Sequence, residues 1–99
     1  TMIAYRRTWH IKLGCMDQAR ELIQIPVDGF KEHGWIGRAY SSHVSPADVI
    51  VWEENWESEA EHDKAWAEIR NGARAQEWYP RWYEVVERGG ALEIWRLQA

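Results

Sequence analysis

The segment DVIVWEENWESEAEHDKAWAEI, residues 48–69, indicates a buried strand that leads directly into a helix. Its continuous apolar run from Val49 to Trp52 is typical of a strand that is covered on both faces. Ser58 then stands at an N-cap position, and Glu61 follows three residues later, which completes a capping box. The apolar stripe of the helix consists of Ala65, Trp66 and Ile69.

The part of the chain before this segment predicts one strand and one helix. Apolar and polar residues alternate over residues 2–13, which predicts a strand. Helical spacing of apolar residues then predicts a helix from Asp17, as its N-cap, to His33. Pro26 lies inside this helix and removes a hydrogen bond, so a kink or a break is expected there. Gly34 is expected to end the helix, because glycine tolerates the left-handed conformation.

Turn signals divide the remainder of the chain. A second strand over residues 35–44 and a Pro-containing turn at residues 45–48 predict a hairpin with the strand of the opening segment. Asn71-Gly72 is expected to interrupt the second helix. Gly89-Gly90 is expected to stop the last part of that helix, and residues 91–97 form a final strand.

The predicted order β-α-β-β-α-β is that of an α+β ferredoxin-like domain, a four-stranded antiparallel sheet with helices on one face. We expect residues 2–99 to form a single such domain. The third and last strands carry apolar residues on both faces, whereas the helices cover only one face of the sheet. The other face is therefore expected to pack against the same face of a second copy, which predicts a homodimer.

The composition of the chain argues against some classes of binding partner. The chain has 12 Lys and Arg against 16 Asp and Glu, without a basic run, which argues against nucleic acid. No stretch is long and apolar enough to span a membrane, and no signal peptide is recognisable, so no membrane partner is expected. The single Cys15 favours a reducing, cytoplasmic location. Eight Trp are unusual in 99 residues and are suited to cores, interfaces or pockets for flat ligands.

Motifs rich in Trp span nearly the whole chain. They are Met2-Ile3-Ala4-Tyr5-Arg6-Arg7-Thr8-Trp9 with Gly14, the turn Glu32-His33-Gly34-Trp35, and Val51-Trp52, Trp56, Ser58 and Trp66. This pattern resembles the dimeric α+β barrel superfamily, and within it the NIPSNAP-like and antibiotic-biosynthesis-monooxygenase-like proteins. The resemblance implies a dimeric α+β barrel with a pocket between the sheet and the helices of one subunit. Members include cofactor-free monooxygenases, haem-degrading monooxygenases and proteins with no assigned reaction, and fold alone does not choose among them.

The haem-degrading members of the superfamily have a recognisable residue pattern. It comprises an Asn seven residues before the Gly, a helical Trp and, about ten residues further on, a His that binds iron. Here Arg7 stands seven residues before Gly14, Trp66 matches the Trp, and Gln76 takes the place of the His. Because Gln is a poor haem ligand compared with imidazole, we expect no haem, and we expect no other cofactor.

Arg7 is the candidate catalytic residue. It is a cation in the middle of the apolar face of the first strand, and a buried charge requires a partner. Its planar guanidinium could bind a substrate carboxylate, phenolate or enolate. The alternative is an internal salt bridge to Glu53, Glu93 or another carboxylate.

The candidate ligand-binding residues are Tyr5, Trp9, His43, Trp56 and Trp66. Aromatic side chains commonly line ligand pockets, and an imidazole is suited to act as a general base near neutral pH. The alternative is that the aromatic residues belong to the core and that His43 is solvated. No His spacing or thiolate cluster predicts a metal site, so none is expected.

Three functions follow from the sequence. The first is binding of a small, partly aromatic molecule in a pocket between the sheet and the helices. The second is a cofactor-independent monooxygenase or isomerase acting on an electron-rich aromatic or polyketide-like substrate, with Arg7 stabilising its anionic form and Trp66 holding its ring. The third is a structural dimer in which every Trp belongs to the core. An open cavity would separate the third function from the other two.

Overall fold

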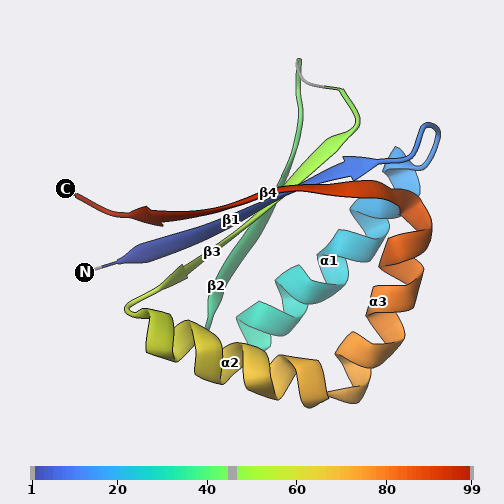
Figure 1. Cartoon of the computed structure of the whole chain (residues 1–99). Coiled ribbons are helices and arrows are strands. Elements are labelled where there is room, and N and C mark those ends of the chain that lie inside the picture. Colours follow the sequence, from blue (N-terminus) through green and yellow to red (C-terminus); the bar gives the residue numbers. More distant parts are fainter. Residues whose placement is uncertain (1, 45–46, 99) are drawn as a thin grey trace.

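The computed structural model describes residues 2–44 and 47–98. Its elements, in chain order, are β1 (Ile3–Ile11), α1 (Met16–Glu32), β2 (Ile36–Ser41), β3 (Val49–Trp56), α2 (Glu59–Asn71), α3 (Ala73–Val85) and β4 (Val86–Arg96). Over these described residues, the four strands form one antiparallel sheet in the order β2-β3-β1-β4. All the helices lie on one face of the sheet (Figure 1). The α+β ferredoxin-like arrangement is therefore confirmed, with the second helix divided into α2 and α3.

The opening segment forms the predicted joint between a strand and a helix. β3 extends beyond the apolar run and includes Glu53 and Glu54, both of which are buried. Ser58 is the N-cap of α2, and its hydroxyl accepts a hydrogen bond from the backbone N–H of Glu61 at 3.2 Å. The Glu61 carboxylate accepts from the backbone N–H of Glu57, at 3.1 Å, instead of that of Ser58. The N-cap is thus confirmed, and the reciprocal bond of the capping box is shifted by one residue.

Pro26 lies within α1 without ending it, so of the predicted kink or break the break is wrong. Because proline has no N–H, the carbonyl of Leu22, four residues earlier, lacks its donor within the helix. The indole N–H of Trp78, on α3, donates to this carbonyl at 2.7 Å. A side chain from another helix thus replaces the missing hydrogen bond. The predicted cap is also wrong, since the N-cap of α1 is Cys15 and not Asp17.

Glycines mark two different features of the second half of the chain. Gly72 ends α2 and precedes α3, which confirms the predicted interruption. Gly89 and Gly90 do not stop a helix, because α3 runs directly into β4 and both glycines lie in that strand. A Cβ at Gly89 would lie only 2.7 Å from Nη2 of Arg7. The missing side chain therefore allows β4 to approach the Arg7 guanidinium, and a glycine in a strand commonly marks such an approach.

The hairpin between β2 and β3 extends above the rest of the sheet in Figure 1. β2 ends at Ser41, earlier than predicted. Ser45 and Pro46, which belong to the predicted turn, lie outside the described residues. At the other end of β2, Gly34 has φ of +72°, as expected for the residue that ends α1.

The outer face of the sheet carries no helix within the described part of the chain (Figure 1). Partly exposed apolar side chains on this face are those of Ile36, Tyr40, Trp95 and Leu97. Among them Glu53 is buried and pairs with Arg6, at 2.6 Å between Oε2 and Nη2. The outer face therefore combines apolar surface with a partly buried ion pair.

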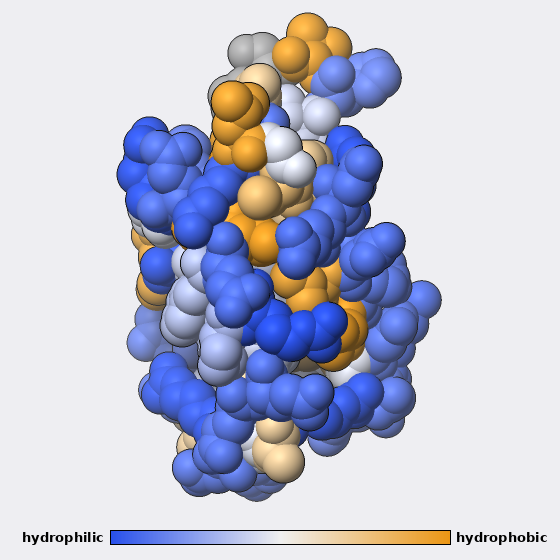
Figure 2. Space-filling view, turned by 90° about the vertical axis from the view of Figure 1, so that its right-hand side faces the viewer, coloured by the Kyte–Doolittle hydropathy of each residue, from blue (hydrophilic) through white to orange (hydrophobic). Residues whose placement is uncertain are grey.

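Viewed from the side of α3, the surface is mainly hydrophilic (Figure 2). The hydrophobic side chains in this view gather mainly in a narrow central band and at the top (Figure 2). Over residues 2–44 and 47–98, no helix has the length and apolar character needed to span a membrane.

Candidate functional site

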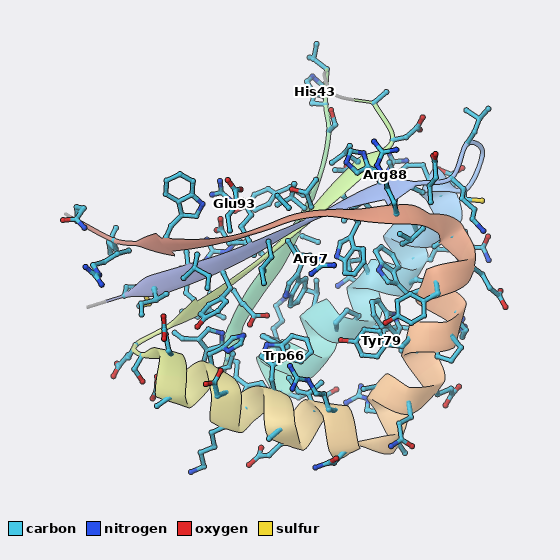
Figure 3. All side chains as sticks on the ribbon, in the orientation of Figure 1. Arg7, His43, Trp66, Tyr79, Arg88 and Glu93 are labelled. Atoms are coloured by element: carbon cyan, nitrogen blue, oxygen red, sulfur yellow. The ribbon has the colours of Figure 1, made fainter. Side chains whose placement is uncertain are left out.

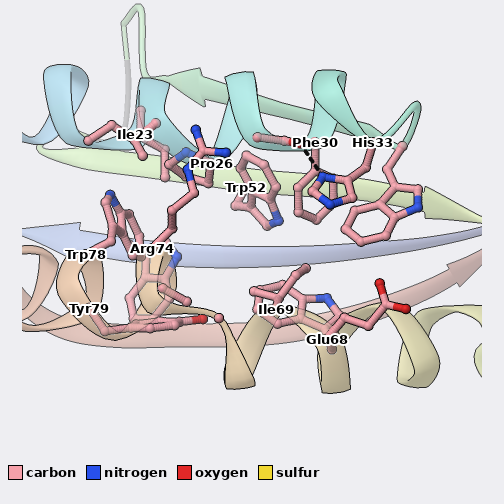
Figure 4. A pocket seen from close by; sticks show the side chains of 17 residues that line it. Ile23, Pro26, Phe30, His33, Trp52, Glu68, Ile69, Arg74, Trp78 and Tyr79 are labelled. Carbon is pink, nitrogen blue, oxygen red and sulfur yellow. Dashed lines mark hydrogen bonds between the residues drawn. The ribbon is translucent and has the colours of Figure 1, made fainter.

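A cavity of about 260 Å³ lies between α1 on one side and α2 and α3 on the other, with the sheet behind it (Figure 4). A cavity of about 150 Å³ is enough to admit benzene. The aromatic side chains that line this cavity are Trp9, Phe30, Trp35, Trp52, Trp66, Trp78 and Tyr79. The cavity is thus large enough for a substituted ring and is lined mainly by flat apolar surfaces.

Contacts between rings fix the walls of the cavity. Trp9 on β1 and Trp52 on β3 point toward the helices, because alternate residues of a strand share a face. Phe30 of α1 meets Trp52 edge-on, with ring centroids 5.1 Å apart. Trp9 meets Trp82 edge-on at 5.9 Å, and Trp82 stacks on Trp78 at 5.1 Å. The walls are therefore formed by side chains of regular elements that pack against one another.

Glu54 lies behind this wall and is 2% exposed. Its carboxylate accepts hydrogen bonds from three indole N–H groups, those of Trp52 at 2.7 Å, Trp56 at 2.9 Å and Trp66 at 2.6 Å. Two of these indoles, Trp52 and Trp66, line the cavity. Sequence analysis missed this role, although Glu54 stands midway between Trp52 and Trp56 and therefore shares their face of β3.

His62 lies between the buried carboxylate of Glu54 and the exposed carboxylate of Asp63. Its Nε2 lies 3.4 Å from Oε1 of Glu54, and its Nδ1 lies 2.9 Å from the exposed carboxylate of Asp63. The imidazole also stacks on the ring of Tyr5, with centroids 3.8 Å apart. Burial, with the nearby Glu59, Asp63 and Glu54 carboxylates, raises the pKa of Tyr5, so its phenol stays protonated at neutral pH. The surroundings of Tyr5 are therefore those of a core residue.

Arg7 lies on the helix-facing side of β1 (Figure 3), where its guanidinium carbon is 4.5 Å from the ring centroid of Trp9. Its Nε is buried without a hydrogen-bond partner among the described residues. The expected salt bridge to Glu53 or Glu93 is wrong, because Arg6 is the residue that pairs with Glu53. Strand alternation places Arg6, Glu53 and Glu93 on the outer face, opposite to Arg7. Arg7 does not line the cavity, but it contacts Trp9, which does.

Arg74 and Glu68 are the Arg, Lys, Asp or Glu residues among the described residues that line the cavity. Arg74 of α3 lines it and donates from Nη1 to Oε2 of Glu32 on α1, at 2.7 Å. This hydrogen bond lowers the pKa of the Glu32 carboxyl and raises the pKa of Arg74, so both remain charged at neutral pH. Burial raises the pKa of Tyr79, which also lines the cavity and is therefore a neutral phenol. The pair of Arg74 and Glu32 links the two helices across the cavity.

The five predicted ligand-binding residues lie in three different places. Trp9 and Trp66 line the cavity. Tyr5 and Trp56 are buried behind it in the core. His43 is exposed in the hairpin between β2 and β3, away from the helices (Figure 3). Within residues 2–44 and 47–98, no group of three or more His, Cys, Asp or Glu side chains could hold a metal ion.

No protein-family model and no curated protein sequence matches this chain. A NIPSNAP family protein from Agrobacterium tumefaciens matches in structure with a TM-score of 0.84 and 17% identity, over 99% of this chain and 94% of that one. A NIPSNAP domain protein from Burkholderia xenovorans matches with a TM-score of 0.82 and 13% identity, over 100% and 96% of the two chains.

A protein of a different description has the same fold. A candidate antibiotic biosynthesis monooxygenase from Chloroflexus aurantiacus matches with a TM-score of 0.74 and 12% identity, over 100% of this chain and 95% of that one. Sequence identities this low show that the folds are shared, but they do not show that the proteins share a reaction or a ligand. The chain therefore has the fold shared by NIPSNAP family proteins and antibiotic-biosynthesis-monooxygenase-like proteins, as its sequence motifs implied.

Proposed function

We propose that this protein binds a small, partly aromatic molecule in the cavity between α1 and α2–α3. The observation that carries the proposal is the cavity itself, which is apolar, lined by aromatic side chains and about 260 Å³ in volume. Apolar pockets with a few polar groups at defined positions are typical of small-molecule sites. The cavity also weighs against a purely structural dimer whose Trp residues are all core.

Filling the cavity is expected to weaken binding. Ala75 lies on α3 and lines the cavity, so Ala75→Leu places three additional carbons in the space that a ligand would use. Affinity for 2-naphthamide, measured by titration calorimetry, is expected to fall at least about fivefold.

The matched control for this variant is Ala73→Leu. Ala73 is exposed on the same helix and does not line the cavity. Its substitution is expected to leave the affinity unchanged. Equal affinities for the two variants and the unmodified protein would place the ligand elsewhere.

A cofactor-independent monooxygenase or isomerase is the second candidate, and Arg7 is the observation that favours it. Its Nε lacks a partner among the described residues, and its guanidinium stacks on Trp9 at the cavity wall. Because Arg7 does not line the cavity, this candidate requires a shift of Trp9 that lets a substrate anion reach the guanidinium and supply the missing acceptor. Oxygen uptake with a panel of hydroxylated aromatic compounds tests this candidate. Unchanged uptake in Arg7→Gln would remove Arg7 from the reaction.

We also propose that the outer face of the sheet packs against the same face of a second copy. Trp95 and Tyr40 are half exposed there, beside the ion pair of Arg6 and Glu53. A second sheet would bury this apolar area, as isologous dimers do. Sedimentation at micromolar concentration is expected to show a dimer, and Trp95→Glu is expected to shift it toward monomer. A monomer at that concentration in the unmodified protein would contradict the proposal.

A further inference from the structure

We propose that the cavity selects ligands that carry a carboxylate, and that Arg74 is the residue that binds this group. The inference rests on the proposed function and adds the chemical class of the ligand, an aromatic or alicyclic acid. Three observations support it, namely the path of the Arg74 side chain, the distribution of charge around the cavity, and the single partner of its guanidinium.

The Arg74 side chain crosses from α3 to α1 along the cavity (Figure 4). Its guanidinium packs close to the α1 backbone, since a Cβ at Gly29 would lie 4.0 Å from Nη1. Arg74 is a lining residue, so a molecule in the cavity would contact it. A guanidinium in this position borders the ligand and remains accessible from solvent.

The charge around the cavity is asymmetric. Arg74 is the only Arg or Lys among the lining residues. Glu68 lies toward the opposite end, on α2, with its carboxylate away from Arg74 (Figure 4). His33, at the α1 rim, has its Nδ1 2.9 Å from the backbone oxygen of Gly29 and its ring stacked on Trp35. Glu68 therefore repels an acidic group from its end of the cavity. At the other end Arg74 offers N–H donors to the ligand, beside the carboxylates of Glu32 and Asp28.

The guanidinium of Arg74 has N–H donors beyond the one that binds Glu32. Glu32 accepts the one side-chain hydrogen bond that Arg74 makes to the described residues, through Nη1. A guanidinium carries five N–H donors and binds a carboxylate best through two parallel hydrogen bonds. Glu32, which does not line the cavity, thus binds Arg74 through a single hydrogen bond. A ligand carboxylate that makes two hydrogen bonds to the guanidinium would displace the Glu32 carboxylate. Both side chains of this pair are more than half exposed, so the exchange requires little desolvation.

The experiment uses matched acids and amides of the same shape, namely benzoate and benzamide, 2-naphthoate and 2-naphthamide, and indole-3-acetate and indole-3-acetamide. Titration calorimetry at low salt is expected to give each bound acid about fivefold higher affinity than its amide. Arg74→Gln is expected to abolish this difference, by lowering the affinity for the acid more than the affinity for the amide. Glu32→Gln is expected to increase the acid affinity alone, because it removes the competing carboxylate.

Arg81→Gln is the matched control, since Arg81 is exposed on the same helix and does not line the cavity. It is expected to keep the full difference between acid and amide. Equal affinities for acid and amide in the unmodified protein would overturn the inference and leave the proposed function standing. Loss of both affinities in Arg74→Gln would show a structural role for Arg74 and would overturn it too. If no compound of the panel binds, both the function and the inference fail.

Discussion

Glu54→Leu is expected to lower the free energy of unfolding by about 3 to 5 kcal/mol. The substitution removes the acceptor for three indole N–H groups, those of Trp52, Trp56 and Trp66. Each buried donor left without an acceptor costs roughly 1 to 3 kcal/mol, with the lower end applying to the half-buried Trp66. Urea unfolding followed by far-UV circular dichroism measures the change without depending on Trp emission.

Two further variants define the origin of this loss. Glu54→Gln keeps one acceptor oxygen but turns an amide N–H₂ toward an indole donor, so an intermediate loss of about 2 kcal/mol is expected. Glu57→Leu changes an exposed glutamate that directly follows the same strand and is expected to stay within about 0.5 kcal/mol. A Glu54→Leu protein as stable as the Glu57→Leu protein would show that the indole cluster does not stabilise the fold.

Gly37→Ala is expected to lower the free energy of unfolding by about 2 to 3 kcal/mol. Gly37 is on the helix-facing side of β2, and a Cβ there would lie 2.6 Å from Cδ2 of Phe30 and 2.8 Å from Cη2 and Cζ2 of Trp52. Any movement of the rings disturbs existing contacts, because Glu54 accepts the hydrogen bond of the Trp52 indole and Phe30 packs edge-on against Trp52. Both rings line the cavity, so affinity for 2-naphthamide is expected to fall as well.

Gly29→Ala is the matched control, a change of the same size in a helix. A Cβ at Gly29 would find no atom nearer than Nη1 of Arg74, at 4.0 Å. The substitution is therefore expected to stabilise the protein by about 0.5 to 1 kcal/mol, since alanine has the higher helix propensity. Thermal unfolding of both variants measures the contrast. Equal melting temperatures would contradict the close packing of Gly37 against the two rings.

Features encoded by neighbouring residues could be predicted from the sequence. The strand–helix joint at Ser58 and the interruption at Gly72 depend on local hydrogen bonding and backbone conformation, and both are confirmed. The unbroken helix at Pro26 and the position of Gly89 within a strand were not predicted, because both depend on distant partners. Trp78 supplies the donor that keeps α1 intact, and Arg7 occupies the space that a side chain at Gly89 would fill. No local pattern contains that information.

The same limit applies to the candidate site. Alternation along β1 placed Arg7 on the apolar face of the strand, and the structure shows that the helices cover this face (Figure 3). It could not assign Glu53 to Arg6, because that pairing depends on the register between β1 and β3. Arg74 was missed for a similar reason, since its place at the cavity follows from how α3 packs against α1.

The most direct test of the proposed function is a crystal structure of the protein grown with 2-naphthamide. The cavity between α1 and α2–α3 is expected to hold the fused rings, in contact with Trp9, Trp52 and Trp66. A cavity filled by the protein's own side chains, or a ligand bound only on the outer surface, would contradict the proposed function.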